Sequence, residues 1–476
     1  MQNPPLLAAR MNIVVQITFS KMPGGEAPPP RWLTLLPSFL RSKIAHRPNL
    51  QKILVNTGWL FGDKILRMGV GLFVGVWIAR YLGPEQFGLL SYALAFVALF
   101  TAVANLGLNG IVVRDLVQHP STAKNTMGTA FVLSVLGGFC AFCLSLLAIS
   151  YARPDDELAK FIVVLLSLLM VFKATDVVRY WFESQVQSKY VVWMENSAFL
   201  AISTVKIGLI VVEAPLMAFV WAMFVESLIV AVGLLGIYAW RGGKLTAWCF
   251  RFARAKALLK DSWPLILSGL AIMVYMRIDQ LMLGQMLEDE SVGIYSAAVR
   301  ISEVWYFIPM AIVASVFPSI IEAKKQNETI YYQRLQKLFD LMVMLSLSLA
   351  LLMTFLSNWV VILLFGTAYQ KAGPVLAVHI WAGAFVFLGV ASGNWFLIEG
   401  LQRYTFYRTL LGAVVNVGLN LLMIPKFGAT GAAYATVISY AIAAMFSDLL
   451  QKETRPMFRM KLRAFNILRI AKSIRR

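Results

Sequence analysis

The sequence predicts an all-α integral membrane protein of about twelve transmembrane helices, in two six-helix halves related by an internal parallel repeat. Three observations support this prediction: an apolar composition, apolar runs long enough to cross a bilayer, and a motif that occurs twice. Of the 476 residues, 59% are hydrophobic and 14% are charged. Soluble domains are about 45–50% apolar and about 25% charged, so the composition favours a membrane protein.

The apolar runs divide the chain into twelve predicted spans. A helix needs about 20 residues to cross the hydrocarbon core, and each apolar run is at least about that long. Together they leave no stretch for a soluble catalytic domain. The predicted spans are 54–80, 86–113, 126–151, 158–181, 190–212, 215–239, 262–287, 292–319, 338–365, 374–400, 406–425 and 430–450.

The basic residues predict the orientation of these spans. Of the 43 Lys and Arg residues, 32 fall in the tails and connections on one side of the membrane and five on the other. Cytoplasmic connections carry the excess of Lys and Arg, so both chain ends are predicted to be cytoplasmic. The basic residues behind the net charge of +19 therefore lie mainly in the segments that are predicted to be cytoplasmic. They do not form a compact basic patch, and no nucleic-acid partner is expected.

An internal repeat supports the division into halves. Residues 83–93 (GPEQFGLLSYA) follow the first span, and residues 288–298 (EDESVGIYSAA) follow the seventh. Glycine permits a tight turn, and small residues let the next helix pack closely. Because both copies begin on the same side of the membrane, the halves are expected to be related by an axis along the membrane normal. That is the parallel-repeat plan of transporters.

The repeat and the connections together predict five segments. The interval 241–261 is the longest basic connection and lies at the centre of the chain. The final segment alternates apolar and basic residues, as in a helix lying on an anionic leaflet. The segments are a disordered N-terminal cytoplasmic tail at 1–53, an N-terminal half at 54–240, a cytoplasmic linker at 241–261, a C-terminal half at 262–451 and a basic amphipathic cytoplasmic tail at 452–476.

Two stretches of the chain resemble a known family. One is 78–88 (IARYLGPEQFG), and the other is 277–284 (RIDQLMLG) followed by 292–298 (VGIYSAA). These resemble Wzx-type O-antigen flippases of the multidrug/oligosaccharidyl-lipid/polysaccharide (MOP) exporter superfamily. The resemblance implies translocation of polyprenyl-pyrophosphate-linked oligosaccharides across the bacterial inner membrane by alternating access, for cell-surface polysaccharide synthesis. It also implies contact with membrane lipids and work beside a polysaccharide polymerase and glycosyltransferases.

Charged residues inside the predicted spans are the candidate site. A charge in the bilayer core costs at least about 2.5–3.5 kcal/mol, so it usually faces the bundle interior or a water-filled cavity. A cationic cavity would complement a pyrophosphate, and Arg offers bidentate geometry. The alternative, that these residues form structural ion pairs, stays open. The candidate substrate-binding cations are Arg67, Arg277 and Arg300, then Lys64 and Lys206; the candidates for ion coupling or charge pairing are Asp63, Asp279, Glu303 and Glu226.

Other function classes are less compatible with the sequence. There is no GxxxxGK[ST] phosphate loop, no catalytic set and no metal spacing among the His and Cys residues, so no enzyme, cofactor or metal site is predicted. A multidrug cation exporter of the same superfamily would favour acids where this chain has Arg. A polymerase would have a large outer loop, and every outer connection here is short. A non-transporting component of polysaccharide assembly stays open.

Overall fold

A computed structural model describes residues 48–466 and 469, and this part of the chain contains helices and no strand. The expectation of a disordered tail therefore falls mostly outside the described residues. The α-helices are α3 (Pro48–Asn105), α4 (Asn109–Gln118), α5 (Ala123–Ala152), α6 (Glu157–Phe172), α7 (Asp176–Ser184), α8 (Lys189–Val211), α9 (Leu216–Trp240), α10 (Phe252–Met286), α11 (Asp289–Val304), α12 (Phe307–Gln326), α13 (Glu328–Phe365), α14 (Ala372–His379), α15 (Ala382–Ile398), α16 (Gln402–Ala444) and α17 (Arg455–Ala464). Short 3₁₀ turns are η2 (Pro120–Thr122), η3 (Lys173–Thr175), η4 (Leu245–Ala247), η5 (Thr367–Tyr369) and η6 (Phe446–Leu449).

The described residues contain ten helical segments long and apolar enough to cross a membrane. Two of these segments are each two spans joined at a glycine. In α3 the break is at Gly83, with φ 73°, and in α16 it is at Gly428, with φ 58°. Glycine adopts positive φ without the steric cost that other residues incur. The ten segments thus make twelve crossings, which confirms the predicted fold of about twelve transmembrane helices.

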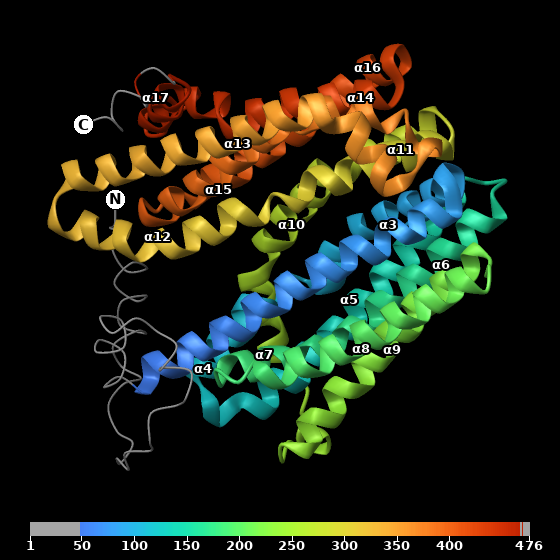
Figure 1. The fold of residues 1–476 in the computed structure, drawn as a ribbon. Helices are drawn as coiled ribbons and strands as arrows, with labels where there is room; N and C mark the ends of the chain where they lie inside the picture. The colour runs from blue at the N-terminus through green and yellow to red at the C-terminus, as the bar shows by residue number, and fades with distance from the viewer. Residues whose placement is uncertain (1–47, 467–468, 470–476) are drawn as a thin grey trace.

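The helices form two groups that converge at one end of the molecule. Figure 1 shows the groups meeting where α3 approaches α11 and diverging toward the end where α12 turns into α13. One group contains α3 and α5–α9, and the other contains α11–α16. Helix α10 runs from the end of the first group to the second. The interior of the bundle is therefore closed at one end and wider at the other.

Two glycines of the sequence repeat meet at the closed end. Gly88 on α3 and Gly293 on α11 occupy equivalent positions of the repeat, and their backbones are in contact. A Cβ atom on Gly88 would clash with the backbone oxygen of Asp289, and one on Gly293 would clash with that of Pro84. Neither position can hold a larger residue while the helices stay this close.

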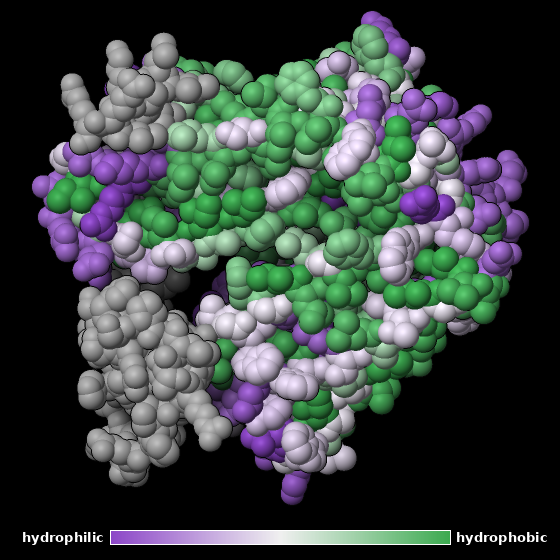
Figure 2. Space-filling model, viewed as in Figure 1, coloured by the Kyte–Doolittle hydropathy of each residue, from purple (hydrophilic) through white to green (hydrophobic). Residues whose placement is uncertain are grey.

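The outer surface agrees with immersion in lipid. Large hydrophobic side chains are exposed along both groups, including Leu147 at 71%, Phe355 at 80% and Trp359 at 62%. Figure 2 shows hydrophobic residues across the middle of the molecule, with hydrophilic residues gathered toward the two ends. A soluble monomer rarely exposes so much contiguous apolar surface. The chain is a multi-pass membrane protein.

Two segments outside the spans differ in detail from the sequence prediction, one in its helicity and the other in its docking on the protein. Helix α10 begins at Phe252, so the second part of the interval 241–261 is helical. Helix α17 is buried on one side, where Met457, Met460 and Ala464 pack against the second group of helices. This amphipathic helix is therefore docked on the protein as well as being strongly basic.

The glycine contact gives a first prediction. Gly88→Ala should lower the stability of the protein, because the added methyl group pushes α3 away from α11; overpacking of this kind typically costs about 1–3 kcal/mol. The measurement is the thermal unfolding midpoint in detergent. Gly418→Ala is the control, since nothing lies within 4 Å of the Cβ position there. Equal midpoints for the two variants would contradict a tight contact.

Candidate functional site

A cavity of about 460 Å³ lies between the two groups of helices, next to the closed end. The first group contributes residues of α3, and the second contributes residues of α10 and α11. Both repeated serines, Ser91 and Ser296, lie in the wall. The three arginines that the sequence singled out, Arg67, Arg277 and Arg300, also line it. The fold therefore brings together three cations from positions far apart in the sequence.

Arg300 crosses from one group of helices to the other. It is on α11, but its guanidinium lies against Gly75 of α3, where any side chain would clash with it. The guanidinium also lies over the ring of Phe87, 5.3 Å from the ring centroid. No carboxylate among residues 48–466 lies within ion-pair distance of it. Arg300 is therefore a half-buried cation in the cavity wall, held by an aromatic face and a glycine.

The other two charged residues that α10 and α11 contribute to the cavity wall are only loosely paired. Arg277 approaches Glu303 at 3.8 Å, which is too long for a good hydrogen bond. The side-chain amide of Gln280 donates a hydrogen bond to the hydroxyl group of Ser296 at 2.9 Å, so these two polar side chains of the wall are partners of each other. Two arginines and one glutamate leave this side of the cavity with an excess positive charge.

Arg67 has a different environment, because carboxylates already neutralise it. Its guanidinium donates to Asp63 at 2.7 Å and to Glu195 at 3.1 Å. Glu195 on α8 also pairs with Arg179 of α7. Asp176 is 3.4 Å from Arg179 and extends the network. Arg67 lines the cavity but has less capacity left for an anionic ligand than Arg300.

Asp279 lies outside the cavity wall, in a buried polar cluster among α10, α11 and α16. Its carboxylate accepts from Tyr295 at 2.7 Å and from Thr436 at 2.6 Å, and also from Asn420. Asp279 is 3% exposed, and no Lys or Arg of the described residues pairs with it. The sequence analysis left open either ion coupling or charge pairing for Asp279. The structure shows a buried carboxylate that accepts hydrogen bonds from neutral donors and forms no charge pair among the described residues.

The remaining candidates lie away from the cavity. Lys206 on α8 pairs with Glu226 on α9 at 2.8 Å, inside the first group of helices. Lys64 is exposed and does not line the cavity. Lys206 and Glu226 are thus an ion pair within one group of helices, and Lys64 is a peripheral cation.

A second charged cluster fastens the closed end. Arg153, at the end of α5, pairs with Asp289 of α11 at 2.6 Å and donates to the Gly284 carbonyl oxygen at 2.9 Å. Its guanidinium stacks 3.9 Å from the ring centroid of Tyr92. The hydrogen bond between Gln285 and Tyr92, at 2.6 Å, also joins the two groups. These contacts exist only while this end is closed.

Sequence reasoning missed several of these residues. It assigned Arg153 to an outer connection, because the partner Asp289 is remote in sequence. It gave Glu195 no special role, because the partner Arg67 is also remote in sequence. Ser91 and Ser296 were visible as equivalent positions of the repeat, and that equivalence could have marked them as cavity residues. Nothing in the sequence marked Phe87 or Gly75 as neighbours of Arg300.

Two helical groups around a central cavity, with an internal repeat, are the fold of solved transporters of the MOP superfamily. The fold is similar to an inward-facing multidrug resistance MATE family transporter of that superfamily, with a TM-score of 0.68 and 15% identity over 83% of this chain and 95% of that one. It is also similar to the lipid II flippase MurJ in an inward closed conformation, with a TM-score of 0.66 and 13% identity over 88% and 92%. The protein is a transporter and not an enzyme.

Within that class, the chain belongs to the family described as polysaccharide biosynthesis protein, which matches residues 53–324. The family described as lipid II flippase MurJ matches residues 198–472. One similar relative is "Probable flippase AglR" of Haloferax volcanii, 23% identical over 408 residues, covering 81% of each chain. The suspected Wzx-type flippase family is thus confirmed.

The closed end yields a second prediction. Arg153→Ala should shift the population toward states in which this end is open, because it removes the ion pair with Asp289 and the stacking on Tyr92. Spin labels at the exposed positions Asp155 and Glu288 would report the distance between the two sides by pulsed electron resonance. We expect a longer distance component in the variant.

Lys160→Ala is the matched control for this experiment. Lys160 pairs with Glu157 three residues earlier on the same helix, so its loss should not affect the junction between groups. An unchanged distance distribution in Arg153→Ala would show that this end stays closed without the contacts of Arg153, and would contradict the prediction.

Proposed function

We propose that this protein flips lipid-linked oligosaccharide repeat units, carried on polyprenyl pyrophosphate, across the bacterial inner membrane for cell-surface polysaccharide synthesis. Arg300 carries the proposal, because it is a half-buried cation without a carboxylate partner in a cavity shared by both groups of helices. A pyrophosphate supplies the missing negative charge, and a guanidinium can bind it with two parallel hydrogen bonds. The family matches and the name of the flippase relative support the same substrate class.

The three arginines would have unequal roles in binding. Arg300 and Arg277 would contact the pyrophosphate, since one is unpaired and the other is only loosely paired. Arg67 would act mainly through the ion network with Asp63 and Glu195 and would set the potential of the cavity. Lys64, Lys206 and Glu226 would have structural roles.

The movement would exchange access between the two faces of the membrane. The excess of Lys and Arg orients both chain ends to the cytoplasm, so the wider end of the bundle would be the cytoplasmic one. Residues 54–240 and 262–451 would move as the two halves. Arg153 and Asp289 would then seal the outer side while the substrate enters from the inner leaflet, near the glycosyltransferases, and a polymerase would use the product outside.

Asp279 is the candidate for ion coupling. Its carboxylate is enclosed by Tyr295, Thr436 and Asn420 and has no basic partner among the described residues. A buried negative charge without a cation is costly, so the site favours uptake of a proton or a small cation. The cluster joins α10, α11 and α16, so its occupancy could change how these helices pack.

The multidrug alternative is less well supported. The similarity to the multidrug transporter is at 15% identity and concerns the fold. A cavity for cationic drugs needs an excess of acidic groups, whereas this wall has Arg67, Arg277 and Arg300 against Glu303. The charge of the cavity favours an anionic substrate.

The third prediction tests the substrate. In a host lacking the wild-type protein, Arg300→Ala should accumulate complete lipid-linked units in the inner leaflet and reduce export about 10–100-fold, as expected for loss of a charge-assisted hydrogen bond. Polyprenyl-linked sugars would be identified by mass spectrometry, with an impermeant reagent reporting the leaflet. Arg300→Lys should retain part of the export, because it keeps the charge without the bidentate geometry.

Lys256→Ala is the control, since Lys256 is exposed and distant from the cavity wall. If Arg300→Ala exports normally, the cationic-cavity mechanism is wrong. If cells without the protein still move complete units to the outer leaflet and lack only the polymer, the flippase function itself is wrong.

The fourth prediction concerns coupling. Asp279→Asn keeps the shape of the side chain but removes its charge, so export should lose its response to an imposed proton or cation gradient while substrate binding persists. Transport would be followed in proteoliposomes with and without each gradient. Glu322→Gln, at an exposed acid, should behave as the wild type. A gradient response that survives in Asp279→Asn would assign coupling elsewhere.

A further inference from the structure

A second cavity lies entirely within the C-terminal half. Its volume is about 370 Å³, and it shares no residue with the central cavity. Helices α10, α12, α15 and α16 contribute its wall. The wall is mostly apolar, with Ile272, Met276, Met310, Val386, Val390 and Ala443 among its residues. Such a surface suits a hydrocarbon chain better than a sugar.

One half-buried cation at the edge of this cavity lacks an acidic partner. Arg408 on α16 donates to Ser392 at 3.1 Å and to the Gly389 carbonyl oxygen at 3.4 Å, and it lies over Phe396. No carboxylate of the described residues is within ion-pair distance of its guanidinium. A guanidinium carries five N–H donors, so neutral groups use only part of its capacity.

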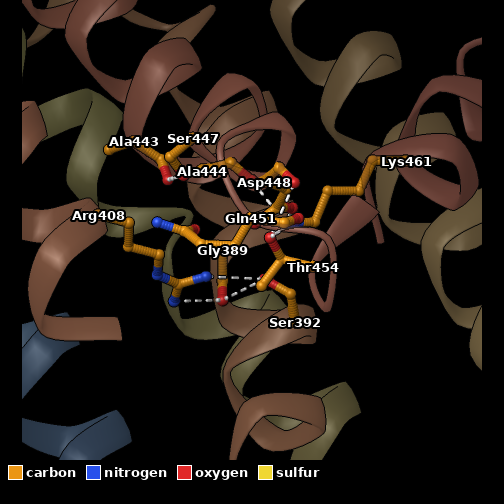
Figure 3. Close-up of polar contacts among 10 residues, drawn as sticks. All are labelled: Gly389, Ser392, Arg408, Ala443, Ala444, Ser447, Asp448, Gln451, Thr454 and Lys461. Atoms are coloured by element: carbon orange, nitrogen blue, oxygen red, sulfur yellow. Dashed lines mark hydrogen bonds and ion pairs between the residues drawn. The ribbon is translucent and has the colours of Figure 1, made fainter. Parts of the chain in front are cut away.

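The acid nearest to this site already has a partner. Asp448 shares a pocket of about 120 Å³ with Arg408, but its carboxylate pairs with Lys461 of α17 at 2.7 Å. Figure 3 shows Lys461 directed at Asp448 and Arg408 directed at Gly389 and Ser392. Lys461 also donates to the Ala444 carbonyl oxygen at 2.6 Å.

The charges of this cluster do not balance. Asp448 is 2% exposed and Lys461 is fully buried. Burial lowers the pKa of Lys461 to about 8, which still leaves it protonated at neutral pH. Asp448 and Lys461 therefore compensate each other, and Arg408 adds a positive charge at the edge of the cavity that no carboxylate of the described residues balances. A cation that is partly withdrawn from water in this way is complemented by one anion.

A second polar group in the same cavity has no partner. Tyr306 lines the cavity wall, and its buried hydroxyl group has no hydrogen-bond partner among the described residues. Tyr306 is only 8% exposed, so water is largely excluded from it. An unsatisfied buried hydroxyl group is unfavourable, and a small side-chain rotation toward the cavity would let a ligand oxygen satisfy it. Arg408 and Tyr306 are thus two donors next to one apolar chamber.

We propose that this second cavity binds an anionic membrane phospholipid, with its phosphate at Arg408 and Tyr306 and an acyl chain along the apolar wall. One negative charge would balance the cluster of Arg408, Asp448 and Lys461. Exposed cations of the neighbouring segment, Lys452, Arg455 and Arg459, would concentrate anionic lipid near the site. The bound lipid would join α10, α12, α15 and α16.

The test is native mass spectrometry of the detergent-purified full-length protein, titrated with phosphatidylglycerol, phosphatidylcholine or polyprenyl phosphate. We expect phosphatidylglycerol to remain bound at least about tenfold more tightly than phosphatidylcholine, which lacks net charge. Arg408→Gln should remove that preference. Arg403→Gln, at an exposed arginine five residues earlier on α16, should keep it.

Two further variants keep the test decisive if Arg408→Gln fails to fold. Tyr306→Phe removes only an unpartnered oxygen and should weaken phosphatidylglycerol binding, and Val390→Phe should block the chamber and displace the acyl chain. Retention of the lipid preference in both variants would overturn the proposal. Preference for polyprenyl phosphate over phosphatidylglycerol would also overturn it, since the cavity would then take the carrier lipid.

The experiment is independent of the transport function. A failure here leaves the central cavity and Arg300 unaffected, because the two cavities share no residue. Conversely, loss of export in Arg300→Ala with unchanged phosphatidylglycerol binding would separate the two sites.

Discussion

The backbone contact between Gly88 and Gly293 is the constraint on which the rest of the structure depends. It brings α3 and α11 together without intervening side chains. Ser91 and Ser296 follow three residues later, about 4.5 Å along each helix at 1.5 Å per residue, so the cavity begins directly beyond the contact. Arg300 lies seven residues beyond Gly293, about 10 Å along α11. A larger residue at either glycine would change the distance between the cavity walls.

The two walls of the central cavity differ in charge for a physical reason. On the first wall, Asp63 and Glu195 surround Arg67, so the ion pairs stabilise the packing of α3 against α8. On the second wall, Arg300 has an aromatic ring and a glycine as neighbours, and Glu303 is closer to Arg277. The charge of the first wall is therefore largely neutralised, and the positive potential of the cavity is concentrated on the second wall. A negatively charged group of a ligand can bind there.

The sequence predicted most of the fold because membrane immersion restricts the possibilities. Backbone groups in lipid must be satisfied within helices, so apolar runs could be assigned as spans with little ambiguity. The glycine repeat then indicated how the halves are related. The extra helical turns of α10 before 262 were missed because that stretch is polar enough to resemble a loop. Local composition cannot distinguish a helix extending beyond the membrane from a linker.

The candidate site was predictable only in part. The cost of burying charge pointed to Arg67, Arg277 and Arg300, and all three line the cavity. Which of them are neutralised depends on contacts across more than a hundred residues, as between Arg67 and Glu195. Asp448 shares a pocket with Arg408 but pairs with Lys461 of α17, and the docking of that helix was not evident from the sequence. Partner choice is a tertiary property, so sequence spacing could not supply it.

Closure of one end and binding in the cavity are linked through Arg300. Its contacts with Phe87 and Gly75 join the two groups of helices while the end is closed. An anion would bind the in-plane N–H groups of the guanidinium, whereas the ring of Phe87 lies against its face. Substrate binding and the contact across the junction would thus use the same side chain. The glycines interlock no side chains, but apolar residues around them pack across the junction, as Phe87 does against Tyr369. The contacts of Arg153 with Asp289 and of Gln285 with Tyr92 also join the two groups. Alternating access would require these contacts to break and re-form together.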